Sequence, residues 1–307
     1  MKIAYLILAH HQSAHLRRLI SALDYADGHF FVHVDLKSDF SRFAGLEKSN
    51  VTVLQKRINV YRAGFSQITA MLSLVEAALQ LHAFDYYIFL SGVDYPIKDN
   101  RYIHEFLMQH RGVNFINFYP LTGDAAGIHH LTKYHLVDLV AGLPGPLALL
   151  MRLMLRVVNL ILPDRKIMSG MVPFRGSTSW CLQHDTVVYL RRFLCSGEGR
   201  ALLMFFRYGW SPDEMLFPTV VLNSPFAEQC RYYERDIKNA KEILRTENKA
   251  YLHYIDWSAG RENPTVLNMT DFEALQKSER LFARKFDEEK SRELLDRIDE
   301  MLLKRRI

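Results

Sequence analysis

The stretch IAYLILA, at residues 3–9, decides the fold of this chain. A continuous apolar run of this length is typical of a strand that is covered on both faces, as in a parallel sheet. Shorter runs of the same kind at residues 30–34, 51–54 and 86–90 predict three more strands. Between these runs, residues 13–23 and 65–81 carry apolar side chains at helical spacing, with Ser13 and Ser66 as candidate N-caps.

Strands that alternate with helices predict an α/β fold with a mostly parallel central sheet flanked by helices. In such a sheet, ligands bind beyond the carboxyl ends of the strands. His10 follows the first predicted strand, Asp35 follows the second, and residues 91–94 follow the fourth. Tyr61 lies in the connection that leads to the helix at 65–81. The sequence therefore predicts that these positions lie along one rim of the sheet.

The composition describes a globular protein with a mildly basic balance. Of 307 residues, 49% are hydrophobic and 24% are charged, which excludes collagen-like, disordered and coiled-coil classes. Neither a repeat nor a linker interrupts the chain, so we expect a single domain over residues 1–307. The net charge of +5 suits an anionic partner. The three cysteines are widely spaced and predict reduced thiols rather than a disulfide framework or a zinc site.

Residues 139–163 form an unusual apolar segment, because only Arg152 and Arg156 are charged in it. One interpretation is a buried helix or a helical insertion. The other is an amphipathic helix on a membrane surface, with both arginines directed toward lipid phosphates. A helix that spans the membrane is not expected, since the two arginines would lie near the centre of the bilayer.

Several familiar signatures do not occur in the sequence. It has no P-loop, no Gly-x-Gly-x-x-Gly after the first strand, no His-Glu-x-x-His and no Asp-x-Asp. An Asp-x-Asp pair would allow carboxylates to hold a divalent ion against a nucleotide diphosphate. We therefore expect no metal site of that kind.

Three charged motifs each allow a structural interpretation and a functional one. The pattern SPDE at residues 211–214 is a helix start, but Glu214 at that place could also be a general base for an incoming hydroxyl. Arg284 and Lys285 form either a solvated face of a charged helix or a pair that neutralises phosphate. Asp94 has either a turn role or a ligand role.

Histidines and a tryptophan add further candidates. The pairs at residues 10–11 and 129–130, together with His33 and Asp35, raise the question of a metal site. A histidine at the end of a strand is more often a hydrogen-bonded structural residue, so we do not expect a metal cluster. Trp257 follows a strand-like stretch and is either core packing or a stacking platform for a sugar ring.

Eight stretches occur in one order from residue 3 to residue 287. They are IAYLILAHH (3–11), VHVDLKS (32–38), VY to GFS (60–66), LSGVDYP (90–96), GS to W (176–180), PDE (212–214), IDWS (255–258) and LFARKFD (281–287). In this order they resemble the core-2/I-branching β-1,6-N-acetylglucosaminyltransferases, a family that also includes the peptide O-xylosyltransferases and bacterial relatives. None of the stretches is decisive alone, but together they cover nearly the whole chain.

The resemblance implies a GT-A-type nucleotide-sugar fold and inversion at the anomeric carbon without a required metal. Glu214 matches the catalytic base of the family. Lys285, with Arg284 beside it, matches the basic residues that face the leaving diphosphate in place of a metal, which is electrostatic stabilisation of the transition state. The remaining assignments follow by position: His10, Asp35 and Tyr61 in the uridine pocket, Asp94 and Trp257 toward the acceptor or sugar, and Arg261 as the nearest counterpart of a further family arginine.

The departures from the animal members shape the expected biology. Those members have an N-terminal membrane helix and many disulfides, whereas this chain begins at the first strand and has three cysteines. We therefore expect a cytoplasmic, bacterial-type enzyme with peripheral contact at the inner face of the cell membrane. The expected donor is UDP-GlcNAc, with UDP-xylose as the alternative. The expected acceptor is a glycan, carried on a lipid in surface polysaccharide synthesis.

Two hypotheses from other classes stay open at this point. The first is a metal-dependent phosphoesterase or deacetylase built on His10, His33 and Asp35. The second is a nucleic-acid-binding module, which the basic balance suggests. Because the cations are scattered and the chain has no recognisable nucleic-acid motif, we expect no nucleic-acid partner.

Overall fold

The computed structural model describes residues 1–25, 27–122, 124–233, 252–256 and 264–304. A six-stranded sheet lies at its centre, in the order β3-β2-β1-β4-β9-β6. The bounds are β3 Val51–Val53, β2 Gly28–Val34, β1 Ile3–Ala9, β4 Tyr86–Ser91, β9 Trp180–Gln183 and β6 Phe115–Ile116. The first four strands of this order are parallel, and β9 is antiparallel to both of its neighbours. The predicted mostly parallel sheet is therefore confirmed.

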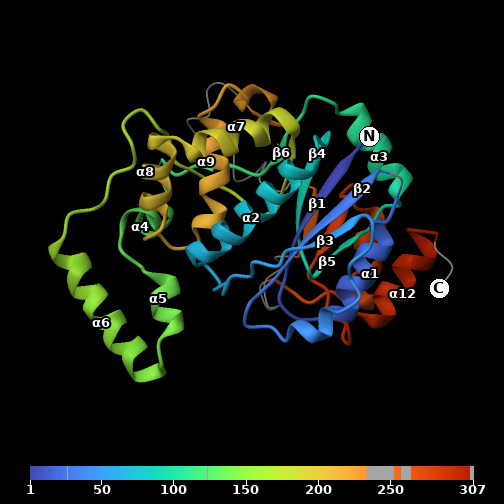
Figure 1. Ribbon diagram of the computed structural model, residues 1–307, viewed down its shortest axis with the longest axis horizontal. Coiled ribbons are helices and arrows are strands. Elements are labelled where there is room, and N and C mark those ends of the chain that lie inside the picture. Colours follow the sequence, from blue (N-terminus) through green and yellow to red (C-terminus); the bar gives the residue numbers. More distant parts are fainter. Residues whose placement is uncertain (26, 123, 234–251, 257–263, 305–307) are drawn as a thin grey trace.

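Helices cover both faces of this sheet (Figure 1). Along β1, Ile3 and Tyr5 enter one hydrophobic core, whereas Ala4 and Leu6 enter the other. The first core includes α1 Ser13–Leu23, α3 Asn100–Gln109 and α12 Arg292–Met301. The second includes α2 Phe65–Leu81, α7 His184–Cys195, α8 Gly197–Phe206 and α9 Leu216–Leu222. Two covered faces explain why residues 3–9 are apolar throughout rather than alternating.

Both predicted N-caps are wrong, although the bounds of their helices are as predicted. The N-cap of α1 is Gln12, and that of α2 is Gly64. Neither makes a side-chain capping bond, because carboxylates from distant segments face these helix starts instead. Glu288 accepts a bond from the backbone N–H of His15 at 3.4 Å in the first turn of α1. In α2, Ser66 lies inside the first turn and bonds Asp138.

A smaller sheet lies beside the first core, in the order β10-β11-β5. Its strands are β10 His253–Ile255, β11 Phe282–Arg284 and β5 Asp94–Pro96. Arg284 thus ends a strand, and the expectation of a charged helix at this position is wrong. The pairing of β11 with β5 is antiparallel and places Arg284 opposite Asp94. Two residues that are far apart in the sequence become neighbours in this way.

The remaining elements are short. A two-stranded sheet joins β7 Tyr119–Pro120 to β8 Phe174–Arg175. The other short helices are η1 Phe40–Phe43, η2 Pro212–Glu214, η3 Ala227–Gln229, η4 Met269–Asp271 and α11 Phe272–Lys277. The predicted helix start at residues 211–214 is thus a 3-10 turn, which leads into α9.

Three helices form a lobe away from the main sheet: α4 Ala125–Thr132, α5 Val137–Gly142 and α6 Gly145–Ile161 (Figure 1). Only Ala148 of α6 is buried, so this helix is an exposed insertion and not a core helix. Its exposed large side chains include Leu160 at 85% and Ile161 at 75%. Among the described residues, no helix is both long enough and apolar enough to cross a membrane.

Candidate functional site

A cavity of about 530 Å³ opens at the carboxyl ends of the parallel strands. His10 follows β1, Asp35 follows β2, and Ser91 ends β4; all three line the cavity. Arg284 and Lys285, at the end of β11, line it as well. This is the edge at which a parallel sheet binds ligands. The structure therefore brings together His10, Asp35, Arg284 and Lys285, which the sequence analysis assigned to the donor site, while their individual roles stay predictions.

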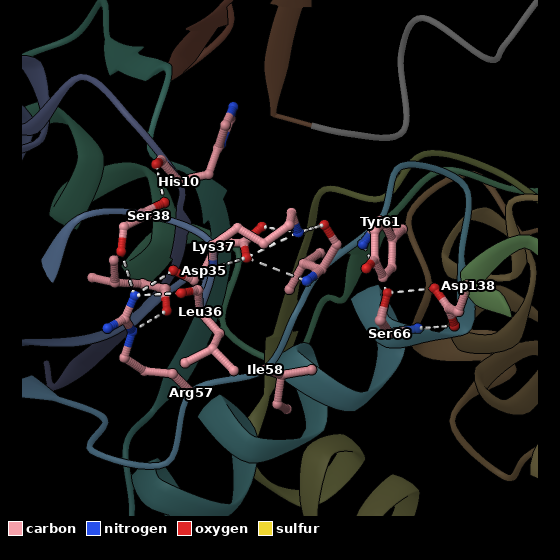
Figure 2. A network of polar contacts seen from close by, with 12 residues as sticks. His10, Asp35, Leu36, Lys37, Ser38, Arg57, Ile58, Tyr61, Ser66 and Asp138 are labelled. Carbon is pink, nitrogen blue, oxygen red and sulfur yellow. Dashed lines mark hydrogen bonds and ion pairs between the residues drawn. The ribbon is translucent and has the colours of Figure 1, made fainter. Parts of the chain in front are cut away.

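Asp35 is held by a lysine that the sequence analysis did not single out. The ammonium of Lys37 lies 2.8 Å from Oδ2 and 3.0 Å from Oδ1 of Asp35, and it also donates to the carbonyl of Val60 at 2.5 Å (Figure 2). The Asp35 side chain is only 7% exposed. Lys37 therefore ties the end of β2 to the loop that precedes α2, and it presents a cation at the cavity wall.

Tyr61 contacts this lysine but does not itself line the cavity. The Lys37 ammonium lies 4.5 Å from the centre of the Tyr61 ring, a cation–π contact. The backbone N–H of Tyr61 donates to the Ser66 hydroxyl, which in turn donates to Asp138 of α5 at 2.6 Å (Figure 2). A chain of polar contacts thus connects the cavity wall to the α4–α6 lobe.

His10 is an uncharged imidazole at neutral pH. Burial lowers its pKa to about 4, and the neighbouring His11 ring, 3.9 Å away between centroids, contributes in the same direction. Of the residues on which the phosphoesterase hypothesis was built, His33 uses its Nε2 to accept the backbone N–H of Ile58 at 3.0 Å. Within the described parts of the chain, no group of three ligating side chains could hold a metal ion.

Arg284 depends on a buried partner, Asp94. Its guanidinium Nη1 lies 3.3 Å from Asp94 Oδ1, and the other carboxylate oxygen lies 3.3 Å from His253 Nε2. Burial alone would raise the pKa of Asp94, but Arg284 and His253 outweigh it, and the pKa is lowered. Because Asp94 has no exposed surface, it acts on a ligand through the groups that it holds, among them Arg284 and the backbone N–H of Ser91 at 2.8 Å. The expected direct acceptor contact at Asp94 does not fit this burial.

Glu214 lies beside the cavity rather than in its wall. Its side chain is 33% exposed and forms an ion pair with Arg175, which ends β8. Both Arg175 donors reach the same oxygen: Nε lies 3.0 Å and Nη2 lies 2.7 Å from Oε2. The pairing orients the carboxylate, and within the described parts of the chain Oε1 is left for another donor. Nothing in the local sequence around Arg175 marks this pairing across 39 positions.

Asp213 connects Glu214 to the cavity. Its Oδ2 accepts bonds from Thr178 Oγ1 at 2.7 Å and from Gln67 Nε2 at 3.3 Å, and both partners line the cavity. Burial raises the pKa of Asp213 to about 6, and the adjacent Glu214 charge adds to the effect. Its Oδ1 is buried and has no hydrogen-bond partner among the described residues. Sequence reasoning treated this residue only as part of a helix start.

Two predicted site residues, Trp257 and Arg261, lie outside the residues that the structure describes. Their expected roles toward the acceptor and the diphosphate stay predictions.

Comparison with known proteins identifies relatives of the whole chain. A family model described as Core-2/I-Branching enzyme matches residues 3–278. Xylosyltransferase 1 of Rattus norvegicus is 26% identical over 313 residues, which cover 98% of this chain and 35% of that protein. Xylosyltransferase 2 of Canis lupus familiaris is 27% identical over 312 residues, which cover 97% of this chain and 33% of that protein. The chain thus spans about a third of the length of these relatives.

A solved structure of mouse xyloside xylosyltransferase 1 in its apo form is similar at a TM-score of 0.32 and 12% identity. The superposed residues make up 72% of this chain and 82% of the mouse chain. No conclusion about the fold rests on a likeness of this size.

Proposed function

The chain belongs to the Core-2/I-branching enzyme family, and we propose that it is an inverting glycosyltransferase. In this proposal it moves a sugar from a UDP-sugar to a hydroxyl of a glycan acceptor. One observation carries the proposal: a cavity at the carboxyl ends of the parallel strands has Arg284 and Lys285 in its wall and the Arg175–Glu214 pair beside it. Cations for a leaving diphosphate and a carboxylate for an attacking hydroxyl are the two groups that such a transfer needs.

In the proposed step, Glu214 acts as the general base. Its Oε1 accepts the proton of the acceptor hydroxyl as that oxygen forms a bond to C1 of the donor sugar. The bond from C1 to the diphosphate oxygen breaks on the opposite face, and UDP leaves with that electron pair. The proton on Glu214 then passes to solvent. Attack from the face opposite to the leaving group inverts the configuration at C1.

Arg284 and Lys285 stabilise the charge that develops on the leaving diphosphate. Fixed cations lower the barrier when they are oriented before the reaction. Asp94 provides this orientation for Arg284, since it is fully buried and lies 3.3 Å from the guanidinium. We propose that these residues take the part of a metal, so that no metal cofactor is required.

UDP-GlcNAc is the proposed donor, and UDP-xylose is the second candidate. The second is favoured by the names of the relatives, which are xylosyltransferases 1 and 2. Both donors present the same UDP group to the cavity, so the cations of the site do not distinguish them.

The proposed acceptor is a lipid-linked glycan in surface polysaccharide synthesis, and the proposed location is the cytoplasmic face of the cell membrane. The support is α6, which exposes most of its apolar side chains and carries Arg152 and Arg156 one helical turn apart. Residues 139–163 contain no acidic residue. A basic, exposed, apolar helix suits an anionic lipid surface. We propose no nucleic-acid partner.

A thermal-shift screen tests the donor class. The protein is heated with UDP, UDP-GlcNAc, UDP-xylose or UDP-glucose, in EDTA and again in Mn²⁺. Binding to the native state raises the Tm by mass action, so the donor is the nucleotide sugar that raises it most. The proposal expects the shift, and the transfer or hydrolysis of that donor, to persist in EDTA. Loss of activity in EDTA with recovery in Mn²⁺ would rule out the cation mechanism, and no shift with any uridine nucleotide would rule out the donor class.

A further inference from the structure

Four aromatic side chains gather beside Glu214 and have no part in the chemistry described so far. They are His129, His130, His135 and Trp210, and we call them the ring cluster. The ring centroids lie 5.7 Å apart for His129–His135, 6.0 Å for His130–His135, 5.9 Å for His135–Trp210 and 6.2 Å for His130–Trp210. The first two histidines belong to α4, and Trp210 comes just before η2.

Trp210 is both exposed and held in place. Its side chain is 43% exposed, while its backbone N–H donates to the carbonyl of His130 at 2.9 Å. The next residue, Ser211, adopts a left-handed conformation with φ of 47° and donates its N–H to the carbonyl of Ala63. A partly exposed indole on a fixed backbone is accessible to a ligand rather than filling a core.

The histidines of the ring cluster offer neutral polar groups. Burial is the main cause that lowers the pKa of His130 and of His135. The lowered pKa favours the uncharged imidazole, in which one nitrogen donates and the other accepts, and His135 Nε2 already lies 3.4 Å from the carbonyl oxygen of His129. His130 Nδ1 is buried without a hydrogen-bond partner among the described residues. The ring cluster is also not a metal site within the part of the chain that the structure describes.

The ring cluster is next to the proposed base. Trp210 precedes Glu214 by four residues, and the charges of Arg175 and Glu214 both act on the pKa of His130. A ligand on the ring cluster would therefore lie near Glu214, and a hydroxyl at the edge of that ligand is the group that this carboxylate would need as a proton donor. A sugar ring meets this need, because it combines an apolar C–H face with hydroxyls around its rim.

We propose that the ring cluster binds the acceptor sugar, whose C–H face stacks on Trp210 while its hydroxyls bond the imidazoles. This inference rests on the proposed function, since it defines the acceptor side of the same site. Aromatic side chains with a polar edge suit such ligands, because the face of the ring supplies apolar contact and its N–H edge supplies hydrogen bonds.

The position of α6 agrees with this assignment. Asn159, in its last turn, accepts the backbone N–H of Tyr134 at 2.8 Å and donates to the Tyr134 carbonyl at 2.8 Å. Tyr134 is the residue before His135. The exposed apolar helix and the ring cluster are therefore directly connected, so an acceptor whose lipid part lies near α6 can present its sugar to Trp210.

Saturation-transfer NMR on the UDP-saturated protein tests the inference. The probes are the methyl β-glycosides of galactose, glucose, xylose and N-acetylglucosamine. At least one is expected to receive saturation, and Trp210→Ala is expected to weaken its binding by about three- to ten-fold. Trp210→Phe should lose less, because it keeps an aromatic face. Tyr102→Ala, which removes an equally exposed ring (43%) from α3, should leave the binding unchanged.

Two outcomes would overturn the inference: no glycoside binds the UDP-saturated wild-type protein, or Trp210→Ala binds it as the wild type does. If Trp210→Ala does not fold, as judged by its melting curve, His129→Ala at the exposed edge of the cluster and Trp210→Phe replace it, and unchanged binding in both has the same meaning. UDP binding is measured separately in every variant. Its absence in the wild type would contradict the proposed donor class, and the glycosides are then titrated without nucleotide.

Discussion

Arg175 directs two hydrogen bonds at a single oxygen of Glu214, with Nε at 3.0 Å and Nη2 at 2.7 Å from Oε2. Hydrogen bonds between charged partners are about twice as strong as neutral ones. The pair therefore holds the carboxylate in one orientation, while Oε1 receives no hydrogen bond from the residues that the structure describes. A carboxylate with one oxygen fixed and the other open is suited to accept a proton from a hydroxyl.

Replacing Glu214 with glutamine should stop transfer and spare UDP binding. The amide keeps the shape of the side chain but cannot accept the proton, and general-base catalysis is typically worth about 100- to 10,000-fold. We expect kcat to fall within that range and the UDP-induced rise in Tm to stay. Glu198→Gln, an exposed glutamate in the first turn of α8, is the control. Full turnover in Glu214→Gln would remove this residue from the mechanism.

Replacing Arg175 should reduce kcat more than the apparent affinity for the donor. Without its partner, the Glu214 carboxylate loses its orientation, and a misplaced catalytic group can cost about 100-fold. Arg175→Lys should recover part of the loss, because an ammonium keeps the charge but not the two-pronged geometry. Steady-state kinetics of both variants separate the two effects. Equal loss in Lys and Ala variants would mean that charge alone is insufficient, whereas wild-type kcat in Arg175→Ala would contradict the positioning role.

Lys285→Met should weaken UDP binding whether or not a divalent metal is present. A hydrogen bond to a charged group contributes about 1.5–3 kcal/mol, which corresponds to a loss of about 10- to 100-fold in affinity. Calorimetric titration of UDP in EDTA and in Mn²⁺ measures this. Lys290→Met removes an exposed lysine nearby and should bind UDP normally. Recovery of Lys285→Met by Mn²⁺ would indicate that a metal, and not the side chain, holds the diphosphate.

The stabilising contribution of Asp213 to the folded protein should be lost as the pH rises. Its pKa is raised from 3.8 to about 6 in the folded state, so its favourable contribution is complete below about pH 4 and is lost as the pH passes 6. A difference of about two pKa units corresponds to on the order of 2–3 kcal/mol. Urea unfolding from pH 4 to pH 7 should therefore show the wild type losing this amount relative to Asp213→Asn.

The comparison with Asp213→Asn is needed because His10 changes the free energy of unfolding with pH in the opposite direction. Its pKa is lowered to about 4, so its contribution is lost as the pH falls from about 6.5 toward 4. Both proteins keep His10, so the difference between them isolates Asp213. If the difference in the free energy of unfolding between the wild type and Asp213→Asn does not change with pH, the pKa of Asp213 is not raised in the folded state.

Helix α6 should bind vesicles that contain anionic lipid. Each basic residue near such a surface contributes about 1 kcal/mol, so changing Arg152 and Arg156 to glutamine together should weaken binding by about 30-fold. The measurement is flotation with phosphatidylglycerol vesicles, at low and high salt. The control pair, Arg200→Gln with Arg207→Gln, removes exposed arginines of α8 and its C-cap and should bind normally. Equal flotation of both double variants would contradict a lipid-binding role for α6.

The sequence by itself determined the strands β1, β2, β3 and β4, the helices α1 and α2, and the rim on which His10 and Asp35 lie. These features depend on local patterns: an apolar run predicts a doubly covered strand, and the carboxyl ends of parallel strands share one edge. The bounds of β1, α1 and α2 follow from the sequence for this reason.

Only the tertiary structure decided which side chains meet. Arg284 faces Asp94 because β11 pairs with β5 across 190 positions, and the start of α2 meets Asp138 across 72 positions. Trp210 joins the histidines of α4, and α6 lies exposed although its sequence also suits a core. The strength of each such contact depends on distance and burial, which packing sets and no local pattern contains.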